Sequence, residues 1–233
     1  MPYRRLDSAK IIETVVRLRA RIAERFPDSG LSRVCAEIEQ VARETEARSA
    51  WIAEPKWWLR VLVGLVAAIA LLGLAGALRS VQVRWEALDI GNLIQSAEAM
   101  TNELVLLVLA VLFLGRIEGR VKRRKALAAL HELRALAHVV DMHQLTKDPE
   151  TTANPQLQTA SSPSRSLSRF ELARYLDYAS EMLAILGKVA ALYAQHFDDE
   201  VVLDTVNEIE SLTSNLSRKI WQKLTILETQ RER

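Results

Sequence analysis

The most regular feature of the chain is a run of eighteen uncharged residues, Val61 to Leu78, which lies between Arg60 and Arg79. At a rise of 1.5 Å per residue, a helix of this length measures about 27 Å, close to the thickness of the hydrocarbon core of a bilayer. A helix buried in a soluble protein rarely stays apolar on every face for five turns. The pattern therefore predicts a transmembrane helix over 57–79.

A second apolar run, residues 104–115, predicts a transmembrane helix over 101–117, with an extracytoplasmic loop over 80–100. This run alone measures about 18 Å as a helix, which also suits a buried helix or a re-entrant segment. Glu98 and Glu103 lie at its outer end. A carboxylate at membrane depth is costly unless it faces water, a partner or a pore. These two residues are therefore expected either at the outer interface or in a pore.

Residues flanking the two runs predict how they are anchored and oriented. Trp57 and Trp58 precede the first run and Trp85 follows it, as interface anchors do. Six basic residues follow the second run, and they are Arg116, Arg120, Lys122, Arg123, Arg124 and Lys125. The loop between the runs is net acidic, so the positive-inside rule places both termini in the cytoplasm. The prediction is a multi-pass protein of the cell inner (plasma) membrane without a cleavable signal peptide.

The basic segment from Arg116 to Lys125 is open to three interpretations. As a stop-transfer signal it needs no further role. Anionic lipid headgroups would add binding of about 1 kcal/mol per basic residue near the surface. Nucleic-acid binding is not expected, because the segment has no aromatic stacking partners and adjoins the predicted bilayer.

The rest of the chain shows helical periodicity. Residues 1–56 predict a helical hairpin turning at Pro27–Gly30, and 118–146 predict a juxtamembrane helix that could continue the second span as one rod. Residues 147–167, rich in Ser, Thr, Pro and Gln, predict a flexible linker. Residues 168–233 predict an antiparallel hairpin. Its first helix opens with a Ser168–Glu171 capping box, and Asp198 or Asp199 caps its second helix. Its second helix has an inner row at 4-3-4-3-4 spacing: Val202, Val206, Ile209, Thr213, Leu216 and Ile220.

Composition adds limits on chemistry. The 233 residues are 49% hydrophobic and 26% charged with a net charge of +2, averages that hide the segregation described above. A single cysteine excludes a disulfide scaffold. No phosphate-binding loop, dinucleotide fingerprint, zinc-protease motif or nucleophile elbow occurs. The sequence therefore predicts a protein that is not an enzyme and that needs no cofactor.

One polar cluster stands out on the predicted juxtamembrane helix. His131, Arg134, His138 and Asp141 are spaced to form one stripe opposite the apolar face. The stripe is a solvated face, a polar seam against another subunit or, with help from a second helix, a metal or pH-sensing site. No further ligand can be assigned from the sequence, which favours the first two interpretations.

The segments HELRALAHVVDMHQLTKDPE (131–150) and NLSRKIWQKL (215–224) resemble an uncharacterised family of bacterial two-pass membrane proteins. The resemblance runs from about Arg116 to the C-terminus and implies no activity. In layout alone, the chain is also similar to two-helix membrane effectors of bacterial nucleotide-signalling defence systems.

Together these patterns predict an all-α protein with a two-pass transmembrane hairpin and a cytoplasmic antiparallel helical bundle or coiled coil. Two functions are open. The first is a non-enzymatic scaffold or signalling component that forms homo-oligomers, contacts anionic lipids and presents its cytoplasmic helices to an unidentified protein partner. The alternative is an oligomeric ion channel or pore-forming effector, suggested by Glu98, Glu103 and small residues in the spans.

Overall fold

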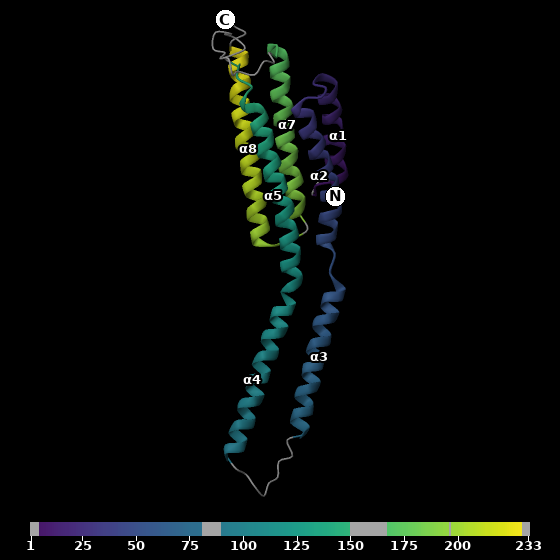
Figure 1. Ribbon diagram of the computed structural model, residues 1–233, viewed down its shortest axis with the longest axis vertical. Coiled ribbons are helices and arrows are strands. Elements are labelled where there is room, and N and C mark those ends of the chain that lie inside the picture. The colour runs from purple at the N-terminus through teal and green to yellow at the C-terminus, as the bar shows by residue number, and fades with distance from the viewer. Residues whose placement is uncertain (1–4, 81–89, 150–166, 196, 230–233) are drawn as a thin grey trace. The chain divides into compact units, whose positions relative to one another are not determined.

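The computed structural model describes residues 5–80, 90–149, 167–195 and 197–229 (Figure 1). The described residues form helices and connecting turns, with no strand among them. The helices are α1 (Ser8–Arg25), α2 (Gly30–Ala53), α3 (Trp57–Ser80), α4 (Ile90–Gly115), α5 (Ile117–Leu145), α7 (Arg169–Ala194) and α8 (Glu200–Thr229). The prediction of an all-α fold is confirmed for these residues. Trp85 and most of the predicted linker over 147–167 lie outside them.

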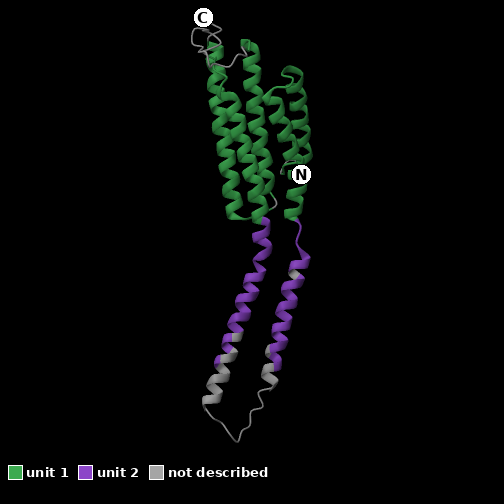
Figure 2. Ribbon diagram, viewed as in Figure 1, with its two compact units in different colours: residues 1–53, 123–233 green, residues 54–122 purple. Residues whose placement is uncertain are grey.

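The chain divides into two compact units, which are coloured separately in Figure 2. Residues 1–53 and 123–233 form one unit, here called the bundle unit, and residues 54–122 form the other, here called the hairpin unit. The boundary falls within α5, so that helix contributes to both. The sequence predicted the hairpins of residues 1–56 and 168–233 as separate segments, whereas both belong to the bundle unit of the structure.

In the bundle unit, α7 and α8 pack along their full lengths. Gly187 faces Thr213, because a Cβ on this glycine would lie 3.2 Å from the threonine Oγ1. At one end, the Arg169 guanidinium donates to the Leu227 carbonyl. The two helices therefore run antiparallel, as predicted. The entire predicted inner row of α8 is buried, because its spacing keeps these residues on the face that meets α7.

The predicted helix pair in the N-terminal segment is present as α1 and α2. In α1, Ile11 and Val15 are buried, while Ile12 is partly exposed. The turn between the helices places Asp28 at a φ of 56°. Asp is one of the few residues other than glycine that tolerate this left-handed conformation. The turn thus reverses the chain and lets α1 pack against α2.

The hairpin unit contains α3 and α4, which pack against each other. Within Gly30–Gly73, one helical stretch of the described chain is long and apolar enough to cross a membrane, and 6% of its apolar window is buried. Since α2 carries charged residues throughout, that window falls in α3. A core helix of a soluble protein would be mostly buried. The second predicted span stays a prediction.

The course of the chain around α4 differs from expectation in two places. First, α4 begins at Ile90, so residues that the sequence assigned to the 80–100 loop are helical. Second, the predicted continuous rod is wrong at Arg116, where a turn separates α4 from α5. The Arg116 amide donates to the Phe113 carbonyl at 3.2 Å, a bond to the third preceding residue that tightens the last turn of α4.

Candidate functional site

The basic segment of residues 116–125 has different surroundings at each position. Lys122 is buried and its Nζ lies 2.9 Å from the Glu118 carboxylate, in the hairpin unit. In the same unit, the Arg120 guanidinium lies 4.4 Å from the centre of the Phe113 ring.

In the bundle unit, Arg123 pairs with Asp199 at 2.7 Å, and the Lys125 ammonium lies 3.7 Å from the centre of the Trp51 ring. Arg116 and Arg124 are exposed and form no ion pair with the described residues. Several of these basic groups therefore stabilise the fold, a role that charge counting did not predict.

Lys125 and Trp51 belong to a cleft between α2 and α5 with a volume of about 380 Å³. Across it, Arg48 lies 2.7 Å from the Glu132 carboxylate and 2.8 Å from that of Glu44. The Glu132 carboxylate raises the pKa of Arg48 above its ordinary value. Because this guanidinium already has two anionic partners, it is poorly placed to attract a further anion.

The predicted polar stripe on α5 is only partly a solvated face. His131 and His138 are exposed. Arg134 instead crosses to α8 and lies 2.8 Å from the Glu208 carboxylate, and Asp141 accepts a hydrogen bond of 2.6 Å from Gln144. Among the described residues there is no group of three or more His, Cys, Asp or Glu side chains that could hold a metal ion. The contact of Arg134 therefore joins α5 to α8, and the seam against another subunit stays a prediction.

Sequence reasoning missed a buried polar cluster at the end of α5. Lys223 of α8 donates to the Gln144 carbonyl at 2.8 Å, to the Gln144 side-chain oxygen at 2.7 Å and to the Lys147 carbonyl at 3.2 Å. Burial lowers the pKa of Lys223. From α7, Tyr175 donates to the His143 carbonyl at 3.3 Å, and burial raises its pKa to about 12. The cluster ties the last turn of α5 to both α7 and α8.

That end of the bundle unit also carries large apolar side chains that remain exposed. Here α5 ends, α7 begins and α8 ends, as the contacts of Lys223 and Tyr175 establish. The exposed side chains are Met142 (67%), Leu145 (62%), Phe170 (62%), Trp221 (67%) and Ile226 (40%). We call these five residues the apolar end. Trp221 also lines a shallow cleft on α7 and α8 with Leu224 and Asp177.

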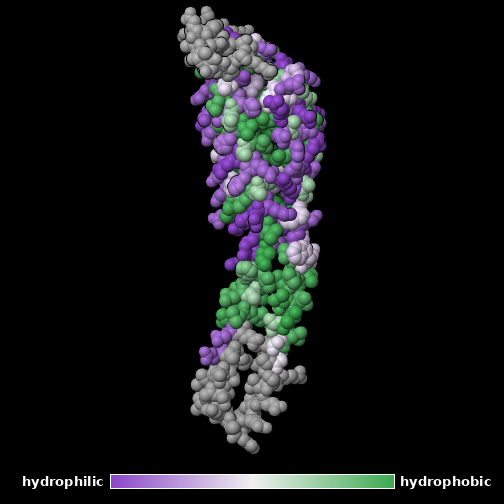
Figure 3. Space-filling model, in the orientation of Figure 1, coloured by the Kyte–Doolittle hydropathy of each residue, from purple (hydrophilic) through white to green (hydrophobic). Residues whose placement is uncertain are grey.

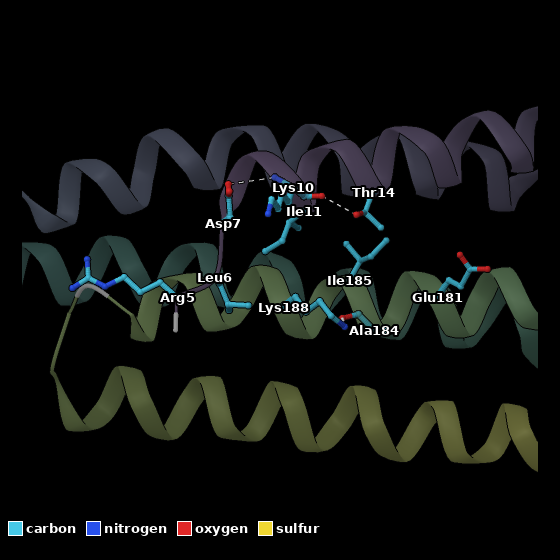
Figure 4. A pocket seen from close by; sticks show the side chains of 10 residues that line it. All are labelled: Arg5, Leu6, Asp7, Lys10, Ile11, Thr14, Glu181, Ala184, Ile185 and Lys188. Carbon is cyan, nitrogen blue, oxygen red and sulfur yellow. Dashed lines mark hydrogen bonds between the residues drawn. The ribbon is translucent and has the colours of Figure 1, made fainter. Parts of the chain in front are cut away.

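A groove of about 460 Å³ lies between the start of α1 and the second half of α7 (Figure 4). Its apolar lining comes from Leu6, Ile11, Ala184 and Ile185. Its charged lining comes from Arg5, Asp7, Lys10, Glu181 and Lys188. The groove is held open by contacts at both ends: Leu6 exchanges two backbone–side-chain hydrogen bonds with Gln195 (2.7 and 3.3 Å), and Arg21 pairs with Glu181.

The two acidic residues of the groove already have partners. The Asp7 carboxylate caps α1 by accepting from the Ala9 amide at 3.0 Å and from the Lys10 amide at 3.4 Å. Glu181 pairs with Arg21, and this hydrogen bond is the main reason that the pKa of Arg21 is raised. The basic side chains of Arg5, Lys10 and Lys188 form no ion pair with the described residues. The groove therefore offers three cations against two carboxylates, of which Glu181 is already neutralised by Arg21, beside an apolar floor.

The residues predicted at the membrane are placed as follows. Trp57 and Trp58 at the start of α3 are 68% and 66% exposed, and Glu98 of α4 is exposed. The side chain of Glu103 lies outside the part of the chain that the structure describes. Comparisons with protein-family models, with curated proteins and with solved structures find no match to this chain. The resemblance to bacterial two-pass membrane proteins therefore rests on residues 131–150 and 215–224 alone.

Proposed function

We propose that the chain is a non-enzymatic two-pass membrane protein that forms homo-oligomers and presents its bundle unit to a protein partner in the cytoplasm. The observation that carries the proposal is the contrast between an apolar, exposed hairpin unit and a packed, amphipathic bundle unit (Figure 3). The resemblance to bacterial two-pass membrane proteins agrees with it.

Exposure along α3 and α4 supports membrane insertion. Large apolar side chains exposed by 44% or more include Val61, Leu62, Leu65, Ile69, Leu71 and Leu72 of α3, and Leu104, Val105, Leu106, Val108, Leu109, Leu112 and Phe113 of α4. Contiguous apolar patches of this kind are rare on soluble monomers and mark membrane or protein interfaces. Lipid is the solvent in which such helices are stable, because all their backbone groups bond within the helix.

The basic residues that follow α4 support the proposed orientation. Arg116 and Arg124 are exposed and form no ion pair with the described residues, so they remain available to anionic headgroups. By the positive-inside rule, this supports a cytoplasmic bundle unit in a cell whose plasma membrane contains the hairpin.

Cysteine labelling tests the topology. In a Cys35→Ala background, Gln82→Cys reports on the loop between the spans and Asp204→Cys reports on exposed α8. A membrane-impermeant maleimide should label the first in intact cells and the second only in inverted vesicles. Labelling of both from the same side would contradict a two-pass topology.

The apolar end supports the proposed protein interaction. Exposed tryptophan at a protein surface is a frequent contributor to binding energy, because it buries a large area at low entropic cost. Trp221 is the most exposed large apolar side chain of α8. We therefore assign oligomerisation or partner docking to this end of the bundle unit.

Mass measurement in zwitterionic nanodiscs tests this assignment. The full chain should form oligomers, and Trp221→Ser combined with Ile226→Ser should shift it towards monomer or release its partner. The matched control is Val201→Ser, which removes an exposed apolar side chain from the opposite end of the same helix. A chain that stays monomeric at every concentration and captures no partner through Trp221 would overturn the proposal.

A pore is the second candidate, because α4 exposes the carboxylate of Glu98 on the same helix as the apolar run 104–115. Purified protein in liposomes should then conduct ions, and Glu98→Gln or Glu103→Ala should reduce the flux. The absence of ion flux with correctly oriented protein favours the non-enzymatic scaffold function.

A further inference from the structure

The function proposed above does not use the groove between α1 and α7, although Glu181 and Ala184 of its lining also line the shallow cleft of Trp221. It lies among residues of the bundle unit alone, so the inference drawn from it holds whether or not the chain spans a membrane. Its volume of about 460 Å³ falls within the range of small-molecule sites, roughly 300–1,000 Å³. Sites of this kind combine an apolar lining with a few polar groups that orient the ligand.

The charged residues that line the groove indicate which class of ligand it binds. The two carboxylates are already engaged, Asp7 as the cap of α1 and Glu181 with Arg21. Of the three cations, Lys188 makes a hydrogen bond of 3.2 Å from its ammonium to the Ala184 carbonyl of its own helix, which leaves its charge uncompensated. Arg5, Lys10 and Lys188 thus favour an anion, and both kinds of side chain bind phosphate, sulfonate and carboxylate groups well.

The apolar lining adds a second requirement. Ile11 and Ile185 are buried at the floor, and the exposed Ala184 also lines the groove. In Figure 4, Ile11 of α1 and Ile185 of α7 lie across the groove from each other, Lys10 is beside Ile11, and Lys188 lies next to Ala184 on α7, while the Arg5 side chain extends away from them. A bare inorganic ion would leave this apolar surface in water. An anion attached to an apolar body would cover it.

We infer that the groove is a binding site for a small amphipathic organic anion, in which the anionic group contacts Lys10 and Lys188 and the apolar body lies on Ile11 and Ile185. The ligand class is an aryl or alkyl phosphate, sulfonate or carboxylate. Such a ligand would bridge α1 and α7, and would thereby link the N-terminal helix pair to the α7–α8 pair.

Titration of the full chain in zwitterionic nanodiscs tests the inference, with empty nanodiscs as the blank. The probes are naphthyl phosphate, the neutral naphthol and inorganic phosphate alone, and binding is followed by calorimetry and by ligand-observed NMR. Naphthyl phosphate should bind more tightly than either of the other probes. Lys10→Gln combined with Lys188→Gln should raise its Kd by about tenfold or more, the size expected when a charge-assisted hydrogen bond is lost.

Matched variants separate the groove from the remaining surface. Ala184→Phe fills the groove from an exposed position and should abolish binding, whereas Ala128→Phe, at an exposed position of the α2–α5 cleft, should not. Lys219→Gln removes an exposed lysine of α8 and should leave the Kd unchanged. Equal binding of naphthol, equal binding of inorganic phosphate, no binding of naphthyl phosphate, or wild-type affinity in Ala184→Phe would each overturn the inference.

Discussion

Helices α8 and α3 use apolar residues in opposite ways. In α8, apolar side chains repeat on one face and are buried against neighbouring helices, while charged residues occupy the remaining faces. In α3, apolar side chains occupy every face and stay exposed, as Leu72 (73%) and Val61 (65%) illustrate. The two patterns are stable in different solvents, one in water and one in lipid. The comparison predicts that equivalent substitutions have very different effects in the two units.

The largest effect is expected from removing a buried leucine of the bundle unit. Leu176 of α7 is fully buried, so Leu176→Ala should lower the free energy of unfolding of the bundle unit by about 2–5 kcal/mol. The measurement is hydrogen exchange of α7 and α8 peptides in denaturant, followed by mass spectrometry. The counterpart in α3 is Leu72→Ala, which should change that free energy by less than about 0.5 kcal/mol. Equal losses in both variants would show that α3 is part of the same cooperative core.

The second largest effect is expected in α3, from a substitution that α8 should tolerate. Leu65→Arg places a charge among the apolar residues of α3 and should disfavour membrane insertion by about 2.5–3.5 kcal/mol. Alkaline carbonate extraction measures the membrane-bound fraction, which should fall sharply. Ser214→Arg, at an exposed position of α8, is the control and should leave this fraction unchanged. Full retention of the Leu65→Arg protein would argue that α3 is not in contact with lipid.

A third effect is expected where the bundle unit departs from its own apolar pattern. Lys223→Met removes the donor to Gln144 and Lys147, and leaves the buried Gln144 oxygen without its partner. The expected cost is about 1–3 kcal/mol, concentrated at the end of α5. Faster hydrogen exchange over residues 137–147 is the measurement, and Lys219→Met on the exposed face of α8 is the control. Unchanged exchange there would mean that the cluster does not hold α5.

Lys223 also illustrates what the sequence could and could not predict. Positions such as Val206 and Ile209 follow from periodicity alone, because one helical spacing satisfies the whole α7–α8 contact. A lysine three residues after Ile220 in that row is a readable signal of a buried polar contact, but its partner on α5 is distant in sequence. The α1–α7 groove also has no signal in the local sequence, because Lys10 and Lys188 come to line the same groove only through tertiary packing.

The break at Arg116 had only a weak local signal. Gly115 and Gly119 flank it, and glycine is the poorest helix former after proline, but no proline interrupts the region. A single glycine is often tolerated inside a helix, so the pattern alone did not require the break. The ion pair of Arg123 has no local signal, because Asp199 is remote in sequence. By contrast, Glu118 and Lys122 are four residues apart on one helix, a spacing that itself indicates an ion pair.

The smallest effect concerns how a helix of the bundle unit begins in water. The Ser168 amide and hydroxyl donate to the Glu171 carboxylate at 2.8 and 2.7 Å, and the Glu171 amide donates to the Ser168 oxygen at 3.3 Å. Ser168→Ala should therefore lower the free energy of unfolding by about 1 kcal/mol. By contrast, α3 begins after Pro55, whose carbonyl accepts from the Trp57 amide at 3.1 Å. Changes at Ser168 should leave membrane insertion unaffected.

The same cap predicts a pH dependence whose sign follows from Glu171. Hydrogen bonds from the Ser168 side chain and then its amide lower the pKa of this carboxyl below its ordinary value of 4.5. The carboxyl therefore contributes stability that is fully present above pH 4.5 and is lost as the pH falls through its lower value in the folded state. Glu171→Gln should be less stable than wild type at pH 7, and the difference should shrink on acidification. Because the carboxylate is exposed, added salt should also weaken the effect. A difference that stays constant down to pH 3 would show that Glu171 acts through packing and not through its charge.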